Sequence, residues 1–166
     1  MTDLIAAPLY EGLGDGLHGV NGKHPKGLEM TKSILRFMIP KSLTVYISDT
    51  ATVRQALEKM SFHRYSAIPV LDREGKFVGT LRNDDIFGYL LKEGSFNKTA
   101  LEAVETLSLI GTNSTKAVKH DATMRELIEG IKEHNFVPVV DDRGCFIGLI
   151  LRREILNYLL KNFKEI

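Results

Sequence analysis

The chain contains the same stretch of sequence twice. Residues 52–92 and residues 123–161 align along their length, first at a spacing of 71 residues and, from Pro69 and Pro138 onward, at a spacing of 69. Both copies end in the same four residues, Tyr-Leu-Leu-Lys. This spacing is longer than the roughly 20–50 residues of a solenoid repeat. The repeat therefore predicts two copies of a small domain, related by a pseudo-twofold axis, with a cleft between them.

Each copy shows the same order of predicted elements: a strand, a helix, a hairpin of two strands and a second helix. Thr52 and Thr123 each open a capping box, with Gln or Glu three residues later, and apolar residues recur behind them at helical spacing. Apolar runs on either side of a turn that contains Asp and Gly then predict a hairpin. The expected strands cover residues 43–47, 66–71 and 77–81 in the first copy and 137–140 and 146–150 in the second.

Further helices complete this prediction. Helices are expected over residues 32–38, 99–109 and 153–163, and one more is expected to be capped by Asn83 or Asp84. Pro40 ends the first of them, because proline cannot continue a helix. The predicted fold class is α/β (α+β), with two strand-helix-strand-strand-helix units that share one core.

The composition excludes several classes of protein. With 43% hydrophobic and 26% charged residues among 166, the chain has the make-up of an ordinary globular protein. The net charge of +1 gives no field that would draw it to nucleic acid or an anionic membrane, and no apolar run reaches the ~20 residues of a membrane span. Cys145 is the one cysteine, so no internal disulfide and no thiolate metal cluster can form. We expect a cytoplasmic protein without a membrane or nucleic-acid partner.

Residues 1–29 differ from the rest of the chain. They are rich in glycine and show no periodicity, so we expect a flexible leader or a segment added ahead of the native start. Gly14–Gly19 matches the G-x-G-x-x-G pattern, but no predicted strand precedes it and no helix follows, which argues against a dinucleotide-binding loop. The expected division is a leader over 1–29, a first repeat over 30–93, a linker over 94–117 and a second repeat over 118–166.

The two copies resemble a tandem pair of CBS (cystathionine β-synthase) domains. The resemblance covers residues 31–166 and rests on Ser66–Asp72, on Phe136–Asp141 and on the segments that begin at Gly79 and Gly148. It implies a Bateman module, in which the two repeats pack together and adenine nucleotides bind in the clefts between them. It also implies that two modules pair as a flat homodimer, and we expect the apolar helix faces, with Tyr89 and Tyr158, to be buried in that pairing.

The ribose–phosphate motif of this family, Gly-x-x-Ser/Thr-x-x-Asp, is altered in the chain. Arg82 and Leu151 stand where the motif has its hydroxyl residue, Glu154 replaces the second acid, and Asp85 alone keeps the family residue. The pattern is most similar to stand-alone bacterial CBS-pair proteins that bind cyclic di-AMP, although these carry a lysine where this chain has Leu43. The shared features are the lead-in residues 37–39, the strand Tyr65–Asp72 and the adjacent arginines Arg152 and Arg153.

A nucleotide needs an apolar slot for its base and cations for its phosphates. Val45, Ala67, Ile68 and Pro69 lie on or beside strand ends and can line such a slot. Arg152 and Arg153 lie where the last helix begins, so their charge and the helix dipole act on the same anion, and we expect Arg153 to bind phosphate with Arg152 as the alternate. The full set of candidate ligand-binding residues is Thr44, Val45, Tyr46, Tyr65, Ser66, Ala67, Ile68, Pro69, Arg82, Asp85, Phe136, Val137, Pro138, Arg152, Arg153 and Glu154.

No catalytic or metal-binding constellation repeats between the copies. His63 and His134 match, but each ends a predicted helix, where the helix dipole favours histidine. We therefore expect a module that is not an enzyme and carries no metal or other cofactor. Its expected function is to sense an adenine nucleotide, foremost cyclic di-AMP, and to control an unidentified partner protein. Two alternatives stay open: a sensor of AMP, ADP or ATP, and a dimerisation scaffold that binds no ligand.

Overall fold

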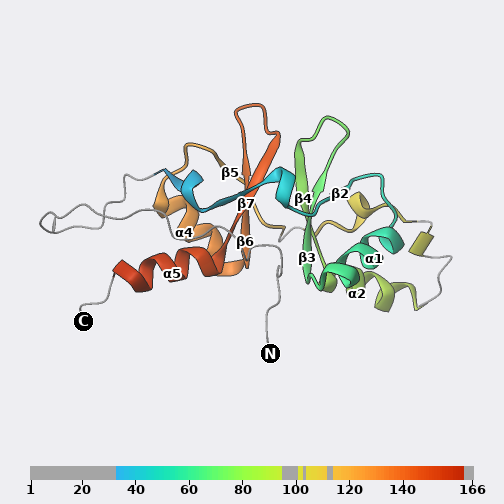
Figure 1. The fold of residues 1–166 in the computed structure, drawn as a ribbon. Helices are drawn as coiled ribbons and strands as arrows, with labels where there is room; N and C mark the ends of the chain where they lie inside the picture. The colour runs from blue at the N-terminus through green and yellow to red at the C-terminus, as the bar shows by residue number, and fades with distance from the viewer. Residues whose placement is uncertain (1–32, 95–100, 103, 112–113, 163–166) are drawn as a thin grey trace, which may run out of the picture.

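The computed structural model describes residues 33–94, 101–102, 104–111 and 114–162. Each repeat forms a strand, a helix, two strands and a second helix, so the predicted fold class is confirmed (Figure 1). The first repeat consists of β2 (Ile47–Ser48), α1 (Val53–His63), β3 (Ala67–Leu71), β4 (Phe77–Arg82) and α2 (Asn83–Glu93). The second consists of β5 (Val118–Lys119), α4 (Met124–Glu133), β6 (Phe136–Val140), β7 (Phe146–Leu151) and α5 (Arg152–Asn162).

The strands form two small sheets at the centre of the molecule, with α1 and α2 on one side and α4 and α5 on the other (Figure 1). The strand order is β2-β3-β4 in the first sheet; in the second, β1 (Met38–Pro40) is followed by β7, β6 and β5. In both repeats the strand ahead of the first helix runs parallel to the next strand, and the hairpin that follows is antiparallel. The register also repeats: Pro69 lies opposite Thr80, and Pro138 lies opposite Leu149.

Strand β1 (Met38–Pro40) joins the sheet of the second repeat, although it precedes the first repeat in sequence. It pairs antiparallel with β7 and places Pro40 opposite Gly148. The predicted helix over residues 32–38 is therefore wrong beyond one turn, because Ile34–Phe37 form a short 3-10 helix and the chain is extended from the next residue. So short a helix has little intrinsic stability, whereas pairing with β7 satisfies the backbone, and proline is tolerated on an edge strand.

The helices begin with side-chain caps. The Thr52 Oγ1 accepts the Gln55 N–H at 3.2 Å, while Gln55 Oε1 accepts the Thr52 N–H at 2.9 Å, and the second repeat has the same reciprocal pair at Thr123. Both predicted capping boxes are thus confirmed. The cap of α2 is Arg82 rather than Asn83 or Asp84, because β4 runs directly into the helix. In the described part of the chain, no helix has the length and apolar character needed to cross a membrane.

Three hydrophobic cores hold the molecule together. One lies in each repeat between the sheet and its helices, around Met60 in the first and Leu127 in the second. Because side chains alternate along a strand, the opposite faces of the two sheets meet each other and form a third core. Its buried members are Leu71, Phe136, Phe146, Leu149 and Leu151. Tyr89 and Tyr158, expected in a contact between modules, are partly buried here and pack against the first and second cores.

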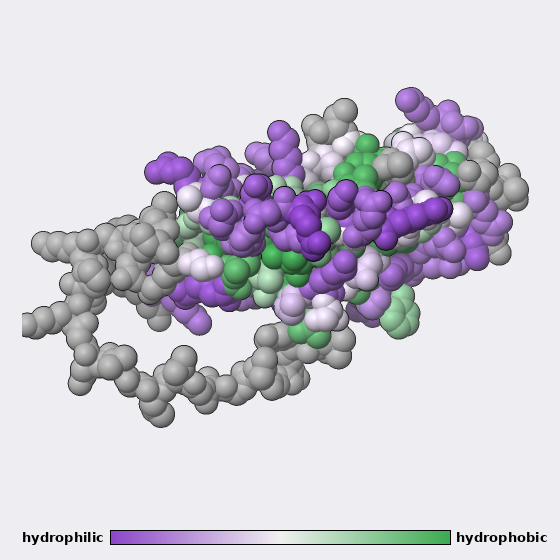
Figure 2. All heavy atoms as spheres, turned by 90° about the horizontal axis from the view of Figure 1, so that it is seen from above, coloured by the Kyte–Doolittle hydropathy of each residue, from purple (hydrophilic) through white to green (hydrophobic). Residues whose placement is uncertain are grey.

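The two hairpin turns touch each other at the top of the view in Figure 1. The Phe77 N–H donates to the Gly144 carbonyl at 3.1 Å, and the Phe146 N–H donates to the Gly75 carbonyl at 2.9 Å. These bonds join residues that are equivalent at a spacing of 69, so the pseudo-twofold axis passes between the turns. Seen from this end, hydrophilic side chains cover most of the surface (Figure 2).

Two predicted elements are shorter than expected. In place of a strand over residues 43–47, Lys41–Leu43 form a 3-10 turn and only β2 pairs with β3. In place of one helix over residues 99–109, residues 101–102 are helical and Thr106–Leu109 form a separate 3-10 turn. Glu105, the residue before that 3-10 turn, forms a β-bridge with Thr52 of the first repeat. This bridge interrupts the expected helix. The start of the expected helix and the expected leader lie outside the described residues.

Candidate functional site

A narrow cleft lies between the two repeats, beside the third core. Its lining consists of Ile39, Leu43, Thr44, Val45, Tyr65, Ala67, Pro69, Phe136, Leu149 and Leu151. Apart from one hydroxyl and one phenol these side chains are apolar, which suits the faces of a purine ring. The cavity measures about 30 Å³, the room of one water molecule. A nucleotide base can therefore enter only when some of the lining side chains move.

Six of the candidate residues from the sequence meet in this cleft: Thr44, Val45, Tyr65, Ala67, Pro69 and Phe136. Two other candidates, Ile68 and Val137, do not, and the sequence-based expectation is corrected for both. Ile68 is fully buried in the first core and Val137 in the second. The reason is the alternation of side chains along a strand: Ala67 and Pro69 face the cleft, so the residue between them faces its own helices.

Three further candidates also lie outside the cleft. The ring of Tyr46 lies 6.4 Å from the ring of Phe146, in the third core region rather than in the cleft. Ser66 is exposed, and its carbonyl accepts the Asn83 N–H at 3.0 Å. Pro138 is buried within β6. These residues are sequence neighbours of residues that line the cleft. Their own side chains or backbone contact other elements of the fold.

Sequence reasoning missed four residues of the lining. Leu149 and Leu151 are two apart on β7, so the alternation pattern could have placed them on one face. Ile39 lines the cleft because β1 pairs with β7 and sets it opposite Leu149, and no local signal predicts that pairing. Leu43 stands at the rim with 62% of its surface exposed. Its position among apolar neighbours was not evident from the sequence.

Arg82 and Arg152 stand where α2 and α5 begin, and His134 ends α4. The Arg152 Nε donates to the His134 carbonyl at 2.9 Å, and Arg82 pairs with Asp84 at 3.0 Å. Burial lowers the pKa of the His134 imidazole; the charge of Arg82 lowers it too, Glu133 opposes the shift, and Arg152 adds a further lowering. Over the described ranges, no carboxylate pairs with Arg152. Such a concentration of guanidinium charge at helix starts suits a phosphate group.

The acidic candidates lie at the same two helix starts. The Asp85 Oδ2 accepts the Arg82 N–H at 2.9 Å, and its other oxygen lies so close to Gly111 that an added Cβ there would be 2.8 Å away. Asp85 thus caps α2 and is partly covered. Glu154 pairs with Arg153, with 3.3 Å between Oε1 and Nε. The side chain of Arg153 is 53% exposed, and this pairing directs its charge along the helix surface.

The pseudo-twofold relation gives the cleft a counterpart with different chemistry. Leu43 and Leu149 of the cleft correspond, at spacings of 71 and −69, to Ser114 and Thr80. The Thr80 N–H donates to the Ser114 Oγ at 2.7 Å. The Thr80 Oγ1 is buried and has no hydrogen-bond partner among the described residues. Polar groups therefore replace the apolar lining on this side, and among the described residues the first cleft is the one of the two that offers an apolar slot.

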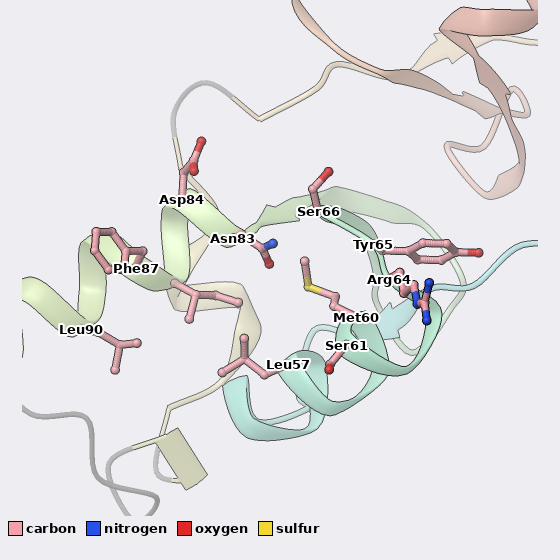
Figure 3. Close-up of a pocket in the computed structure, with 11 residues that line it drawn as sticks. Leu57, Met60, Ser61, Arg64, Tyr65, Ser66, Asn83, Asp84, Phe87 and Leu90 are labelled. Atoms are coloured by element: carbon pink, nitrogen blue, oxygen red, sulfur yellow. The ribbon is translucent and has the colours of Figure 1, made fainter. Parts of the chain in front are cut away.

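A larger groove of about 750 Å³ lies on the outer side of the first repeat, between α1 and α2 (Figure 3). Leu57, Met60 and Leu90 form its apolar floor, and Ser61, Arg64, Ser66, Asn83 and Asp84 contribute polar groups to its lining. Tyr65 lines both this groove and the cleft. The groove is open and lacks the paired arginines, so the cleft is the better candidate for a nucleotide. Tyr65 is the residue that the groove and the cleft share.

Metal binding has no support in the described part of the chain, where no group of three or more His, Cys, Asp or Glu side chains could hold an ion. His63, the sequence partner of His134, packs its ring 4.9 Å from Phe62 and 5.3 Å from Tyr65. It takes part in an aromatic cluster rather than in the charged cluster. The two matched histidines therefore have different surroundings.

Comparison with known proteins agrees with this architecture. The chain is 29% identical over 136 residues to an uncharacterised protein of Methanocaldococcus jannaschii, covering 75% of this chain and 48% of that protein. It is 28% identical over 116 residues to the gamma subunit of 5'-AMP-activated protein kinase from Saccharomyces cerevisiae, covering 67% of this chain and 35% of that subunit. The chain thus spans about half or less of the length of these curated relatives.

A solved structure resembles nearly the whole described fold. The crystal structure of CbpB in complex with c-di-AMP matches with a TM-score of 0.71 at 25% identity, covering 81% of this chain and 90% of that one. The family model for the CBS domain matches residues 30–92 and 110–161, which is more than half of the chain. These two segments follow the two repeats. The chain therefore belongs to the CBS-domain family and forms a Bateman module of two CBS repeats.

Proposed function

We propose that the chain is a regulatory module that binds an adenine nucleotide, foremost cyclic di-AMP, between its repeats and thereby controls a partner protein. The observation that carries this proposal is an apolar cleft with Arg82 and Arg152 at the adjoining helix starts. The cleft can bury a purine base, and guanidinium groups form strong, charge-assisted bonds to phosphate. The complex of the similar protein CbpB with c-di-AMP supports the choice of ligand.

A ligand with two phosphates fits the charged cluster better than a linear mononucleotide. One arginine comes from each repeat, and each stands at the start of a helix, whose exposed N–H groups also favour an anion. A linear mononucleotide bound by the family motif would need its Ser or Thr hydroxyl, which Arg82 and Leu151 replace. A guanine base would bring polar O6 and N2 groups into an apolar slot, at a cost in free energy.

Opening of the cleft provides a route for the signal. The empty cavity has the room of one water molecule, so a bound base has to displace lining side chains. Tyr65 is a wall of the cleft and of the outer groove, so its displacement changes the shape of a surface on α1 and α2 (Figure 3). A ligand shifts such an equilibrium only as far as its affinities for the two states differ. The proposed function requires binding without turnover.

We also infer that the module works as a homodimer. Phe87 and Leu91 on α2 are 57% and 61% exposed, and Leu156 and Leu160 on α5 are 47% and 69% exposed. These two pairs are equivalent at the spacing of 69, and each pair lies four residues apart on one helix face. The same apolar face thus occurs on both sides of the molecule. A second copy, which carries the same two faces, can cover both of them at once.

A sensor of AMP, ADP or ATP is the second candidate. Asp85 keeps the acidic residue of the family motif, and the gamma subunit of a 5'-AMP-activated protein kinase is among the relatives. The ligand-free dimerisation scaffold is the third, favoured by the loss of the motif residues at Arg82, Leu151 and Glu154. Each candidate predicts a different response to a panel of nucleotides.

Thermal unfolding with separate additions of cyclic di-AMP, AMP, ADP, ATP and cyclic di-GMP distinguishes them. At a concentration about 100 times the dissociation constant, cyclic di-AMP should add about 2.7 kcal/mol of stability. At roughly 2–4 °C per kcal/mol for a chain of this size, the melting temperature should rise by about 5–11 °C. A rise with AMP or ATP but not with cyclic di-AMP would establish the energy sensor instead. No rise with any of the five would favour the scaffold.

A further inference from the structure

We propose that Leu43 is the gate of the apolar cleft: its side chain covers the slot in the empty protein, turns aside to admit a purine base, and then packs over the bound base. This inference rests on the proposed nucleotide function. It adds the step by which the ligand enters, and it gives one rim residue a role in both the rates and the affinity of binding. The exposure of Leu43 and the fixed backbone beneath it carry the inference.

Leu43 is the most exposed of the side chains that line the cleft. It has 62% of its surface exposed, whereas each of the other lining residues is half-buried or buried. Moving Phe136 or Leu149 would open a hole in the third core, which is costly because the packing around a core side chain is lost. Leu43 loses little packing when it moves. Entry of a base therefore begins at Leu43, and Tyr65 is displaced once the base is inside.

The backbone around Leu43 is fixed, so the movement belongs to the side chain. Leu43 ends the 3-10 turn that starts at Lys41, and the Thr44 N–H and hydroxyl both donate to the Lys41 carbonyl, at 3.1 Å and 2.9 Å. The Lys41 ammonium lies 5.3 Å from the centre of the Tyr46 ring, a cation–π contact that anchors the turn. A leucine on such a backbone moves by changing between staggered rotamers, and exposed side chains make these changes faster than a ligand binds.

The counterpart of Leu43 in the second repeat is held in place. At a spacing of 71 this residue is Ser114, whose Oγ accepts the Thr80 N–H at 2.7 Å. A leucine side chain has no polar atom and can be held only by packing, of which Leu43 has little. The rim of the apolar cleft can therefore open at a position where the rim of its counterpart is tied.

Leu43 also contributes to binding once the base is in place. A leucine folded back over a purine ring buries apolar surface that water covers in the empty protein. The residue thus slows association, because the base can enter only the fraction of molecules in which the slot is open. It also slows dissociation, because the bound base is covered. A residue that only forms a wall of the site slows dissociation alone.

Surface plasmon resonance with the full chain and cyclic di-AMP measures both rates. Leu43→Ala should raise the association rate constant about 3- to 10-fold and weaken affinity about 5- to 20-fold, so dissociation accelerates by the product of the two. Leu43→Met, which keeps an apolar side chain of similar volume, should stay close to wild type in both rates. Leu35→Ala is the matched control, since Leu35 is also exposed, at 38%, but lies on the first 3-10 helix outside the lining. It should change neither rate.

A second probe separates this inference from the proposed function. Indole is a flat apolar bicycle without a phosphate, and methyl NMR signals of Val45 and Leu149 report its entry into the slot. These signals should shift more in Leu43→Ala than in the wild-type chain. That result without any binding of cyclic di-AMP would support the gate and refute the nucleotide function. Cyclic di-AMP binding with an association rate that Leu43→Ala leaves unchanged would overturn the gate and leave the nucleotide function intact. If neither probe binds to either chain, both proposals fail.

Discussion

Neighbouring residues of the chain have different surroundings at the start of α5. Arg152 is half-buried and bonded to the carbonyl of His134, whereas Arg153 is exposed and paired with Glu154. An arginine that a backbone carbonyl already orients loses less side-chain entropy on binding an anion. The sequence favoured Arg153 for phosphate binding, and the surroundings favour Arg152.

Replacement of each arginine tests this preference. Arg152→Ala should weaken cyclic di-AMP binding by roughly 10- to 150-fold, because a charge-assisted bond contributes ~1.5–3 kcal/mol. Arg153→Ala is the matched control, and its effect should be several-fold smaller, since exposed charges interact weakly through water. Isothermal calorimetry on both variants measures the difference. A larger loss in Arg153→Ala would restore the preference that the sequence suggested.

At the scale of elements, the contact between β1 and β7 is the least expected and the tightest. Pro40 lies opposite Gly148, and a Cβ added at Gly148 would collide with the Ile39 carbonyl oxygen and lie 2.8 Å from the Met38 side chain. Glycine here permits a close approach of two backbones. Ile39 also lines the cleft, so this contact positions part of the binding surface.

Gly148→Ala should therefore destabilise the protein. Pushing β1 away from β7 should cost about 1–3 kcal/mol, typical of overpacking, and lower the melting temperature by about 2–12 °C. Gly79→Ala at the equivalent position is the control: its Cβ would meet side-chain atoms of Ile110, the nearest at 2.6 Å, which can shift more easily than a backbone carbonyl. Thermal unfolding of both variants compares the costs. Equal losses would show that the β1 contact is not specially constrained.

At the scale of the whole molecule, the pseudo-twofold relation extends to the surface. The apolar pairs Phe87 with Leu91 and Leu156 with Leu160 occupy equivalent places on the last helix of each repeat. Tyr89 and Tyr158, by contrast, are used within the chain, the latter with its ring 5.1 Å from that of Phe37. The two leucine-containing pairs are therefore exposed apolar surface that a second copy can cover.

Light scattering at micromolar concentration should report a dimer. The double variant Phe87→Ser, Leu156→Ser should shift it toward monomer, because each large apolar side chain buried in a contact contributes about 1.5–3 kcal/mol. Val78→Thr replaces a methyl group by a hydroxyl at an exposed position on β4, away from these helix faces, and should leave the dimer intact. A wild-type monomer, with and without cyclic di-AMP, would refute the homodimer.

The sequence by itself determined the elements and their repetition. The capping boxes at Thr52 and Thr123, the apolar strands around Pro69 and Pro138 and the glycine turns all depend on residues within a few positions of each other. Local hydrogen bonds and steric limits act over that distance, so the pattern can be read without knowledge of the rest of the chain. The repetition of the same local signals is also what predicted a shared cleft.

Only the tertiary structure decided which side chains meet in the cleft between the repeats. Alternation along each strand sent Ile68 and Val137 into the separate cores, and the pairing of β1 with β7 brought Ile39 to the cleft. The bond between the Arg152 side chain and the His134 carbonyl likewise joins residues from different elements. Which side chains line the cleft depends on contacts between segments far apart in sequence. The free energy of those contacts comes from the burial and pairing of whole surfaces. No local sequence pattern encodes which surfaces meet.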